Sequence, residues 1–485
     1  MAEESLKQKT KKGLYWQFLN QFSNYGIQFI IGIFMARLLS PEDYGITALP
    51  GVFMAVAGIF AGAGFGTAMV RKPELTEEDL ATSFYYSTAV GIICYIILFI
   101  VSPWIAEFYN APVLTPLIRI TALGFIYGPI GTPQNIILTR RLDFKTPTKI
   151  GVICKIISGI IGITMALYGF GVWALAISGM VAGITGLFMN WYVVRWYPKT
   201  GWSKKSFKYL WGFGNKLMAS QLLDTLYNNI TPIFIGKYYS PTDLGIYNRA
   251  EIYASLPSKN VHGVISNVTF PVLSKMQDDD EALARNYRKM LKVTAFVVFP
   301  LMTLLAGIAR PLILIMITSK WESCIILLQI ICFSMMWWPI HAINLNLLLV
   351  KGRGDLFFRL EVIKKIWGII ILASTLPFGL VIFCAGGIFS SLVSLFINTY
   401  YTGKLINCGY LTQMKDLSQT LFLSLLTFAT SISCTYIFAN LWLQLIVGSL
   451  CGGGFYIGLS ILFKMDELQD VKYMLIKKNE YSRNR

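Results

Sequence analysis

The chain has 485 residues, a hydrophobic fraction of 55% and a formal net charge of +17. Run after run of about 20 apolar residues, the length that crosses a bilayer core, excludes a soluble protein. The basic excess does not indicate nucleic-acid binding, because Lys and Arg gather in alternate connections between the apolar runs.

The predicted fold class is an all-α integral membrane protein with about 14 transmembrane helices. If the N-terminus is cytoplasmic, the outside connections contain only Arg37, Lys237 and Lys320 as basic residues. This asymmetry follows the positive-inside rule and predicts that both termini are cytoplasmic. In chain order, the predicted spans are 14–38, 46–70, 82–105, 114–138, 149–168, 171–194, 210–236, 245–272, 291–316, 322–350, 360–379, 381–403, 417–438 and 441–463.

A seven-residue phrase occurs twice, 200 residues apart, which indicates a duplicated chain. It reads Ser-Pro-Glu-Asp-Tyr-Gly-Ile at 40–46 and Ser-Pro-Thr-Asp-Leu-Gly-Ile at 240–246. A second match, at an offset of 210, pairs 127–130 with 337–340. Each repeat holds an even number of spans, so the two six-helix lobes are related by an axis along the membrane normal. The predicted lobes are 1–200 and 201–410, and 411–485 adds two helices and a cytoplasmic tail.

A ladder of polar residues precedes each copy of the phrase. The first span carries Gln21, Asn24 and Gln28 on one helical face, and the seventh span carries Gln221, Asp224 and Asn228. Polar side chains inside the hydrocarbon region are costly unless they face protein or water. The matched ladders favour a shared, water-filled substrate cavity, which is typical of a transporter. The alternative is that these side chains join neighbouring helices, at about 1 kcal/mol each.

The span 245–272 carries a second polar stripe, formed by Glu251, Ser255, Lys259 and His262. A charged side chain in the middle of a span costs at least about 2.5 kcal/mol, so Lys259 is expected to face water, a partner or a ligand. The alternative is an internal ion pair of Lys259 with Glu251 or Asp224.

Three residues of the span 322–350 complete the predicted cavity: Trp337, His341 and Asn344. For His341, a proton relay and a packed, hydrogen-bonded histidine both remain open.

Other basic residues fall into two groups. Besides Lys259, the candidate phosphate contacts are Arg37 and Lys237, at equivalent outer ends of the two ladder helices, and Arg249. Lys155 and Lys365 are expected near cytoplasmic helix ends, where a lysine can extend its ammonium group to the interface.

The sequence contains no phosphate-binding loop, no metal-ligand spacing and no nucleophile motif. We therefore predict no catalytic residue, no bound metal and no cofactor. Transport would draw on the membrane potential, the substrate's own gradient or a coupling ion, H⁺ or Na⁺.

The stretch Ala36-Arg37-Leu38-Leu39-Ser40-Pro41-Glu42-Asp43-Tyr44-Gly45 resembles the polysaccharide transporter family. These are the Wzx-type flippases of the multidrug/oligosaccharidyl-lipid/polysaccharide flippase superfamily. The resemblance implies translocation of an undecaprenyl-pyrophosphate-linked oligosaccharide, such as a lipopolysaccharide O-antigen or exopolysaccharide unit, across the bacterial inner membrane. It also implies that the protein acts together with a polysaccharide polymerase and assembly proteins. The family has no universal catalytic motif, so the site residues above depend on this sequence alone.

The expected mechanism is alternating access, in which the lobes rock around the cleft while the polyprenyl tail stays in lipid. An ion-coupled multidrug exporter of the same fold is the first alternative, and it would favour carboxylates in the cleft. A polysaccharide polymerase or ligase, an enzyme, is the second, and it would be expected to carry a long extracytoplasmic loop. No nucleic-acid partner is expected.

Overall fold

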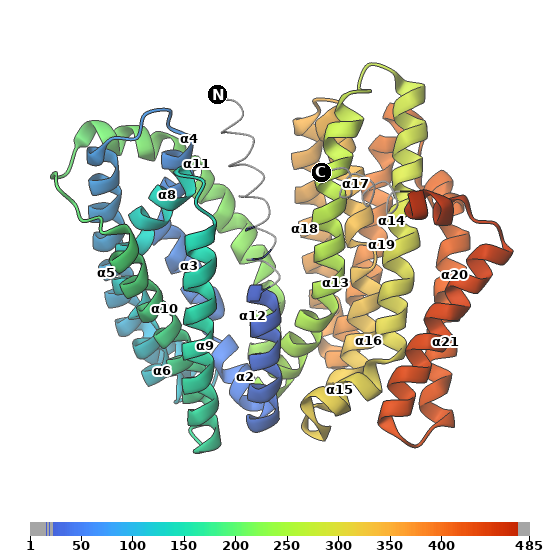
Figure 1. Cartoon of the computed structure of the whole chain (residues 1–485), viewed down its shortest axis with the longest axis horizontal. Coiled ribbons are helices and arrows are strands. Elements are labelled where there is room, and N and C mark those ends of the chain that lie inside the picture. Colours follow the sequence, from blue (N-terminus) through green and yellow to red (C-terminus); the bar gives the residue numbers. More distant parts are fainter. Residues whose placement is uncertain (1–15, 17–18, 20–22, 474–485) are drawn as a thin grey trace. The chain divides into compact units, whose positions relative to one another are not determined.

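The structure is a computed structural model that describes residues 16, 19 and 23–473, without the side chains of residues 262 and 264–268. Within this part of the chain, every regular element is a helix and no strand occurs (Figure 1). The all-α prediction is therefore confirmed for these residues.

The chain divides into two compact units, residues 1–245 and residues 246–485. The first unit contains a helix over residues 23–38 and the elements α2 to α12. Their bounds are α2 Pro41–Ala48, α3 Gly51–Gly62, α4 Phe65–Arg71, α5 Glu77–Phe108, α6 Leu114–Thr121, α7 Gly124–Tyr127, η1 Pro129–Gly131, α8 Thr132–Arg140, α9 Lys145–Leu167, α10 Val172–Val194, α11 Lys204–Asn228 and α12 Ile230–Tyr238.

The helix α13 begins in the first unit and continues into the second, which contains the remaining elements. Their bounds are α13 Pro241–Ser274, α14 Asp280–Gly307, α15 Ala309–Ile317, η2 Ser319–Trp321, α16 Cys324–Met335, α17 Trp338–Val350, α18 Gly354–Thr375, η3 Leu376–Phe378, α19 Leu380–Ile406, α20 Tyr410–Ile437 and α21 Leu441–Leu462. In this unit, α14 packs against α16 and α20, and α20 packs against α21.

Among the described residues, ten helices or runs of consecutive helices are long and apolar enough to cross a membrane, so the chain is a multi-pass membrane protein. Each overlaps one of the fourteen predicted spans, but the helix that overlaps the predicted span 291–316 is Asp280–Gly307, and the rest of that span falls on α15. The other four predicted spans, 14–38, 210–236, 245–272 and 360–379, fall on helices below this threshold, and the first of them is described only from residue 23. Three of the four contain the predicted polar ladders and stripe, so the number fourteen stays a prediction.

The first unit extends beyond the predicted lobe boundary at residue 200 because α11 packs against α3, α4 and α5. Phe207 and Trp211 of α11 stack with ring centroids 5.7 Å apart, and both meet Phe65 edge-on at 6.2 and 6.5 Å. Leu210 is fully buried in the same cluster. The two repeats and their symmetry axis remain predictions.

Both copies of the repeated phrase begin a helix with the same cap. The Ser40 hydroxyl accepts from the Asp43 N–H at 3.2 Å, and the Asp43 carboxylate accepts from the Ser40 N–H at 2.9 Å. Ser240 and Asp243 repeat this arrangement at 3.1 and 3.2 Å. A proline follows each serine at the first helical position, where its missing N–H is no loss. The phrase is thus a helix start.

The glycines of the two copies lie against the opposite copy inside the first unit. A Cβ atom added to Gly45 would lie 1.6 Å from the Pro241 carbonyl oxygen. One added to Gly245 would lie 1.9 Å from the Pro41 carbonyl oxygen. Any side chain beyond hydrogen would collide with backbone, so both positions require glycine for the two helix starts to cross this closely.

Candidate functional site

The predicted ladder of the first span contacts α9. The Lys155 ammonium group donates to the Asn24 backbone carbonyl at 2.9 Å and to Gln28 Oε1 at 3.0 Å. Gln21 lies outside the described residues. Lys155 is in the middle of α9, within Lys145–Leu167, so the expectation that it reaches the interface from a helix end is wrong.

Small residues of α9 bring the two helices together on both sides of Lys155. A Cβ atom added to Gly151 would lie 3.2 Å from Asn24 Oδ1, and one added to Gly159 would lie 2.4 Å from Ile31 Cδ1. This close approach of the two helices brings the Lys155 ammonium group within hydrogen-bonding distance of its two acceptors.

The second ladder lies on the surface of α11. Gln221, Asp224 and Asn228 are all exposed in the first unit. Amides and a carboxylate on an exposed face can bind sugar hydroxyls or a cation. Their predicted role as cavity residues stays a prediction.

On α13, Lys259 is exposed, whereas Glu251 and Ser255 are half-buried. The Ser255 hydroxyl donates to the Ile252 carbonyl at 3.2 Å within the same helix. Lys259 forms no ion pair with Glu251 in the part of the chain that the structure describes. Eight residues separate the two along the helix, a rise of about 12 Å. The side chain of His262 is outside the described set.

The predicted cavity residues Trp337, which caps the start of α17, and Asn344, within α17, lie inside the second unit. Trp337 is 2% exposed and meets Phe299 with ring centroids 4.9 Å apart. Asn344 is 1% exposed; its Oδ1 accepts from Tyr287 at 2.8 Å, and its Nδ2 donates to Gln413 at 3.1 Å. The structure therefore places these two side chains in the packed interior and not on an exposed face.

His341 is hydrogen-bonded on both sides of its ring. Nε2 lies 3.0 Å from the Ser391 hydroxyl, and Nδ1 lies 3.4 Å from Asn398 Nδ2. Both partners are neutral side chains of α19. This geometry fits the packed, hydrogen-bonded histidine better than the proton relay.

The other basic candidates differ in exposure. The Arg249 guanidinium group is buried over the Trp321 ring, 5.3 Å from its centroid. Lys237 is exposed, and its ammonium group donates to the Phe108 carbonyl at 2.6 Å. Arg37 is exposed at the end of the first helix. Of these three, Arg37 and Lys237 lie on an accessible surface.

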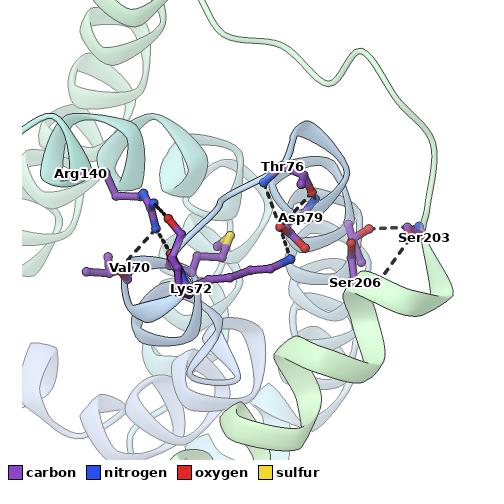
Figure 2. Close-up of polar contacts among 10 residues, drawn as sticks. Val70, Lys72, Thr76, Asp79, Arg140, Ser203 and Ser206 are labelled. Carbon is purple, nitrogen blue, oxygen red and sulfur yellow. Dashed lines mark hydrogen bonds and ion pairs between the residues drawn. The ribbon is translucent and has the colours of Figure 1, made fainter.

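Figure 2 shows a polar cluster of the first unit in which charges are satisfied internally. The Arg140 guanidinium group donates to the carbonyls of Met69 at 2.9 Å and Pro73 at 2.7 Å, which closes the end of α4. Lys72 pairs with the fully buried Asp79 at 2.6 Å. These contacts fix the connection between α4 and α5, so we assign the cluster a structural role.

Within the described part of the molecule, each unit contains a cavity. A cavity of about 860 Å³ in the second unit is bordered by charged residues at the start of α14 and by residues 466–470. A cavity of about 410 Å³ in the first unit is mostly apolar, with Thr47, Thr121 and Tyr127 on its wall. Neither contains a residue of the two ladders, and the role of the ladders as cavity residues stays a prediction.

Comparisons with known proteins give a family and a fold. A family model described as "Polysaccharide biosynthesis protein" matches residues 34–326. The teichuronic acid biosynthesis protein TuaB of Bacillus subtilis is 23% identical over 92% of this chain and 95% of its own length. The succinoglycan biosynthesis transport protein ExoT of Rhizobium meliloti is 26% identical over 63% of this chain and 62% of its own length. The solved structure of the lipid II flippase MurJ, in an inward closed conformation, is similar at a TM-score of 0.72 and 15% identity, covering 93% of this chain and 100% of that one.

Proposed function

The chain belongs to the polysaccharide biosynthesis protein family, and we propose that it is a flippase for lipid-linked oligosaccharide units. The family resemblance predicted from the sequence is thereby confirmed, and the fold is the one shared with a lipid flippase. The observation that carries the proposal is a set of cationic and amide side chains on helices of a multi-pass membrane protein, above all the exposed Lys259 of α13. Such side chains within spans mark a substrate path.

The proposed substrate is an undecaprenyl-pyrophosphate-linked oligosaccharide of the bacterial inner membrane. Lys259 would compensate the pyrophosphate charge, while the exposed amides of Gln221 and Asn228 suit sugar hydroxyls. The polyprenyl tail would remain in lipid as the headgroup crosses by alternating access. Both termini would be cytoplasmic, a coupling ion such as H⁺ or Na⁺ would supply energy, and a polymerase and assembly proteins would receive the unit.

The two alternatives are weaker. A multidrug exporter would favour carboxylates, whereas the α13 stripe contains one half-buried carboxylate, Glu251, and an exposed cation, Lys259. A relative carries the word "transport" in its name, which supports a carrier over a polymerase or ligase. Adjacent genes separate the classes: glycosyltransferases favour a flippase, and a drug-responsive regulator favours an exporter.

Deletion of the gene tests the proposal directly. We expect loss of a surface polysaccharide and accumulation of its lipid-linked precursor, both reversed by the full chain expressed from a plasmid. Lys259→Ala should accumulate to the wild-type level yet fail to restore export, and Lys259→Arg should restore part of it. A deletion strain with normal polysaccharide and raised drug sensitivity would replace the flippase by an exporter.

A further inference from the structure

Lys155 lies deep in the predicted membrane region of the first unit. It is the eleventh residue of the 23-residue helix α9. At a rise of about 1.5 Å per residue, roughly 15 Å of helix separates it from either end. Its side chain is half-buried between α9 and the helix over residues 23–38.

Among the described residues, the partners that hold the ammonium group of Lys155 are neutral oxygens. Its hydrogen-bond partners are the Asn24 carbonyl at 2.9 Å and Gln28 Oε1 at 3.0 Å. Over the described ranges of the chain, no carboxylate oxygen lies within 4.0 Å of it. These oxygens orient the positive charge without neutralising it, and an ammonium group has a third N–H to donate.

A lysine used only to join two helices would not need its charge. An amide pair would hold the same helices without the cost of placing a cation in the hydrocarbon region. The retained charge therefore indicates a negatively charged ligand. Every pyrophosphate-linked oligosaccharide carries negative charge on its phosphate groups, for which a lysine is a common partner.

We propose that Lys155 binds the phosphate group of the lipid-linked substrate, with Asn24 and Gln28 as positioning residues; this proposal rests on the function proposed above. It assigns the polar ladder of the first span a definite task, which is to hold a cation from α9. It also gives the first unit a phosphate contact of its own, besides Lys259 in the second unit.

Binding of farnesyl pyrophosphate to the purified full chain tests this role, with the shift of the thermal unfolding midpoint as the readout. Lys155→Gln keeps a hydrogen-bond donor but removes the charge, and should raise the dissociation constant roughly 10- to 100-fold. Lys155→Arg keeps the charge, so its dissociation constant should stay within a few-fold of the wild-type value. Lys149→Gln, the same loss of charge at an exposed position of α9, should bind like wild type. Unchanged binding by Lys155→Gln would overturn the proposal.

Chemical labelling of the wild-type protein gives a readout that does not depend on the stability of a variant. Farnesyl pyrophosphate should slow acetylation of Lys155, measured by mass spectrometry, while acetylation of Lys149 continues unchanged. Farnesol should protect neither. Equal protection of Lys155 by phosphatidylglycerol would make it a contact for membrane lipid headgroups and would overturn the substrate assignment.

Export separates the failure of this inference from the failure of the proposed function. If the deletion strain loses its polysaccharide and Lys155→Gln restores it fully, the flippase stands and the role of Lys155 is wrong. If the deletion leaves the polysaccharide intact, the proposed function falls and with it the substrate named here.

Discussion

Substitution of Gly45 by alanine should disrupt the crossing of the two repeated phrases. The added Cβ would lie 1.6 Å from the Pro241 carbonyl oxygen, whereas real contacts of this kind essentially never fall below 3.0 Å. The two helix starts would have to separate by at least about 1.4 Å along this contact, the difference between these distances, because backbone cannot rotate away as a side chain can. Overpacking of this kind costs about 1–3 kcal/mol or more, against a helix-propensity gain of at most about 1 kcal/mol.

The net expectation for Gly45→Ala is a loss of about 2 kcal/mol in the free energy of unfolding. For a unit of this size, that lowers the midpoint by about 4–8 °C in a thermal scan of the detergent-purified protein. Gly179→Ala, at an exposed position of α10 with no atom within 4 Å of the added Cβ, is the matched control and should keep or raise the midpoint. Gly245→Ala should destabilise similarly, and the double variant should lose less than the sum, because both changes open one crossing. A wild-type midpoint for Gly45→Ala would refute the tight crossing.

Three further predictions concern topology, access and stability. Reporter fusions after Gly169 and after Arg141 should report opposite sides of the membrane, and agreement between them would overturn the assigned orientation. A cysteine at Asn228, which is exposed, should react with a hydrophilic thiol reagent, whereas one at the fully buried Ile235 should not; equal protection would favour contacts between helices. Asp79→Ala removes the fully buried carboxylate that pairs with Lys72 and should lower the free energy of unfolding by about 3–5 kcal/mol, measured as a lower thermal midpoint. A midpoint within about 1 °C of wild type would contradict the structural role.

The spans could be predicted from sequence because membrane crossing depends on a local property. An apolar run of about 20 residues is sufficient evidence by itself. The breaks within spans are harder, since they depend on single residues. Between α3 and α4 the chain turns at Ala63 and Gly64 with φ of 43° and 68°, inside one predicted span.

The site could be predicted only in part, because helical spacing gives a face but not the neighbour of that face. Helical spacing identifies the ladder of the first span, but not its contact with Lys155, which is 127 residues from Gln28 and depends on the glycines of α9. The spacing of Asn344 along its helix also suits a residue that lines a cavity. Its hydrogen-bond partners Tyr287 and Gln413 lie on other helices, and spacing along one helix does not identify them. Lys155 and Lys365 are separated by 210 residues, the offset of the second sequence match, and this repetition is the signal in the sequence that points to Lys155.

The crossing of the two helix starts has a consequence for the origin of the chain. Pro41 lies against Gly245, and Pro241 lies against Gly45. The proline of each copy therefore contacts the glycine of the other copy. That reciprocity is the pattern of a two-fold interface between identical subunits. An ancestral protein with a single Ser-Pro-x-Asp-x-Gly phrase would meet a second molecule of itself through the same glycine and proline. Gene fusion would then have joined in one polypeptide an interface that already existed between two.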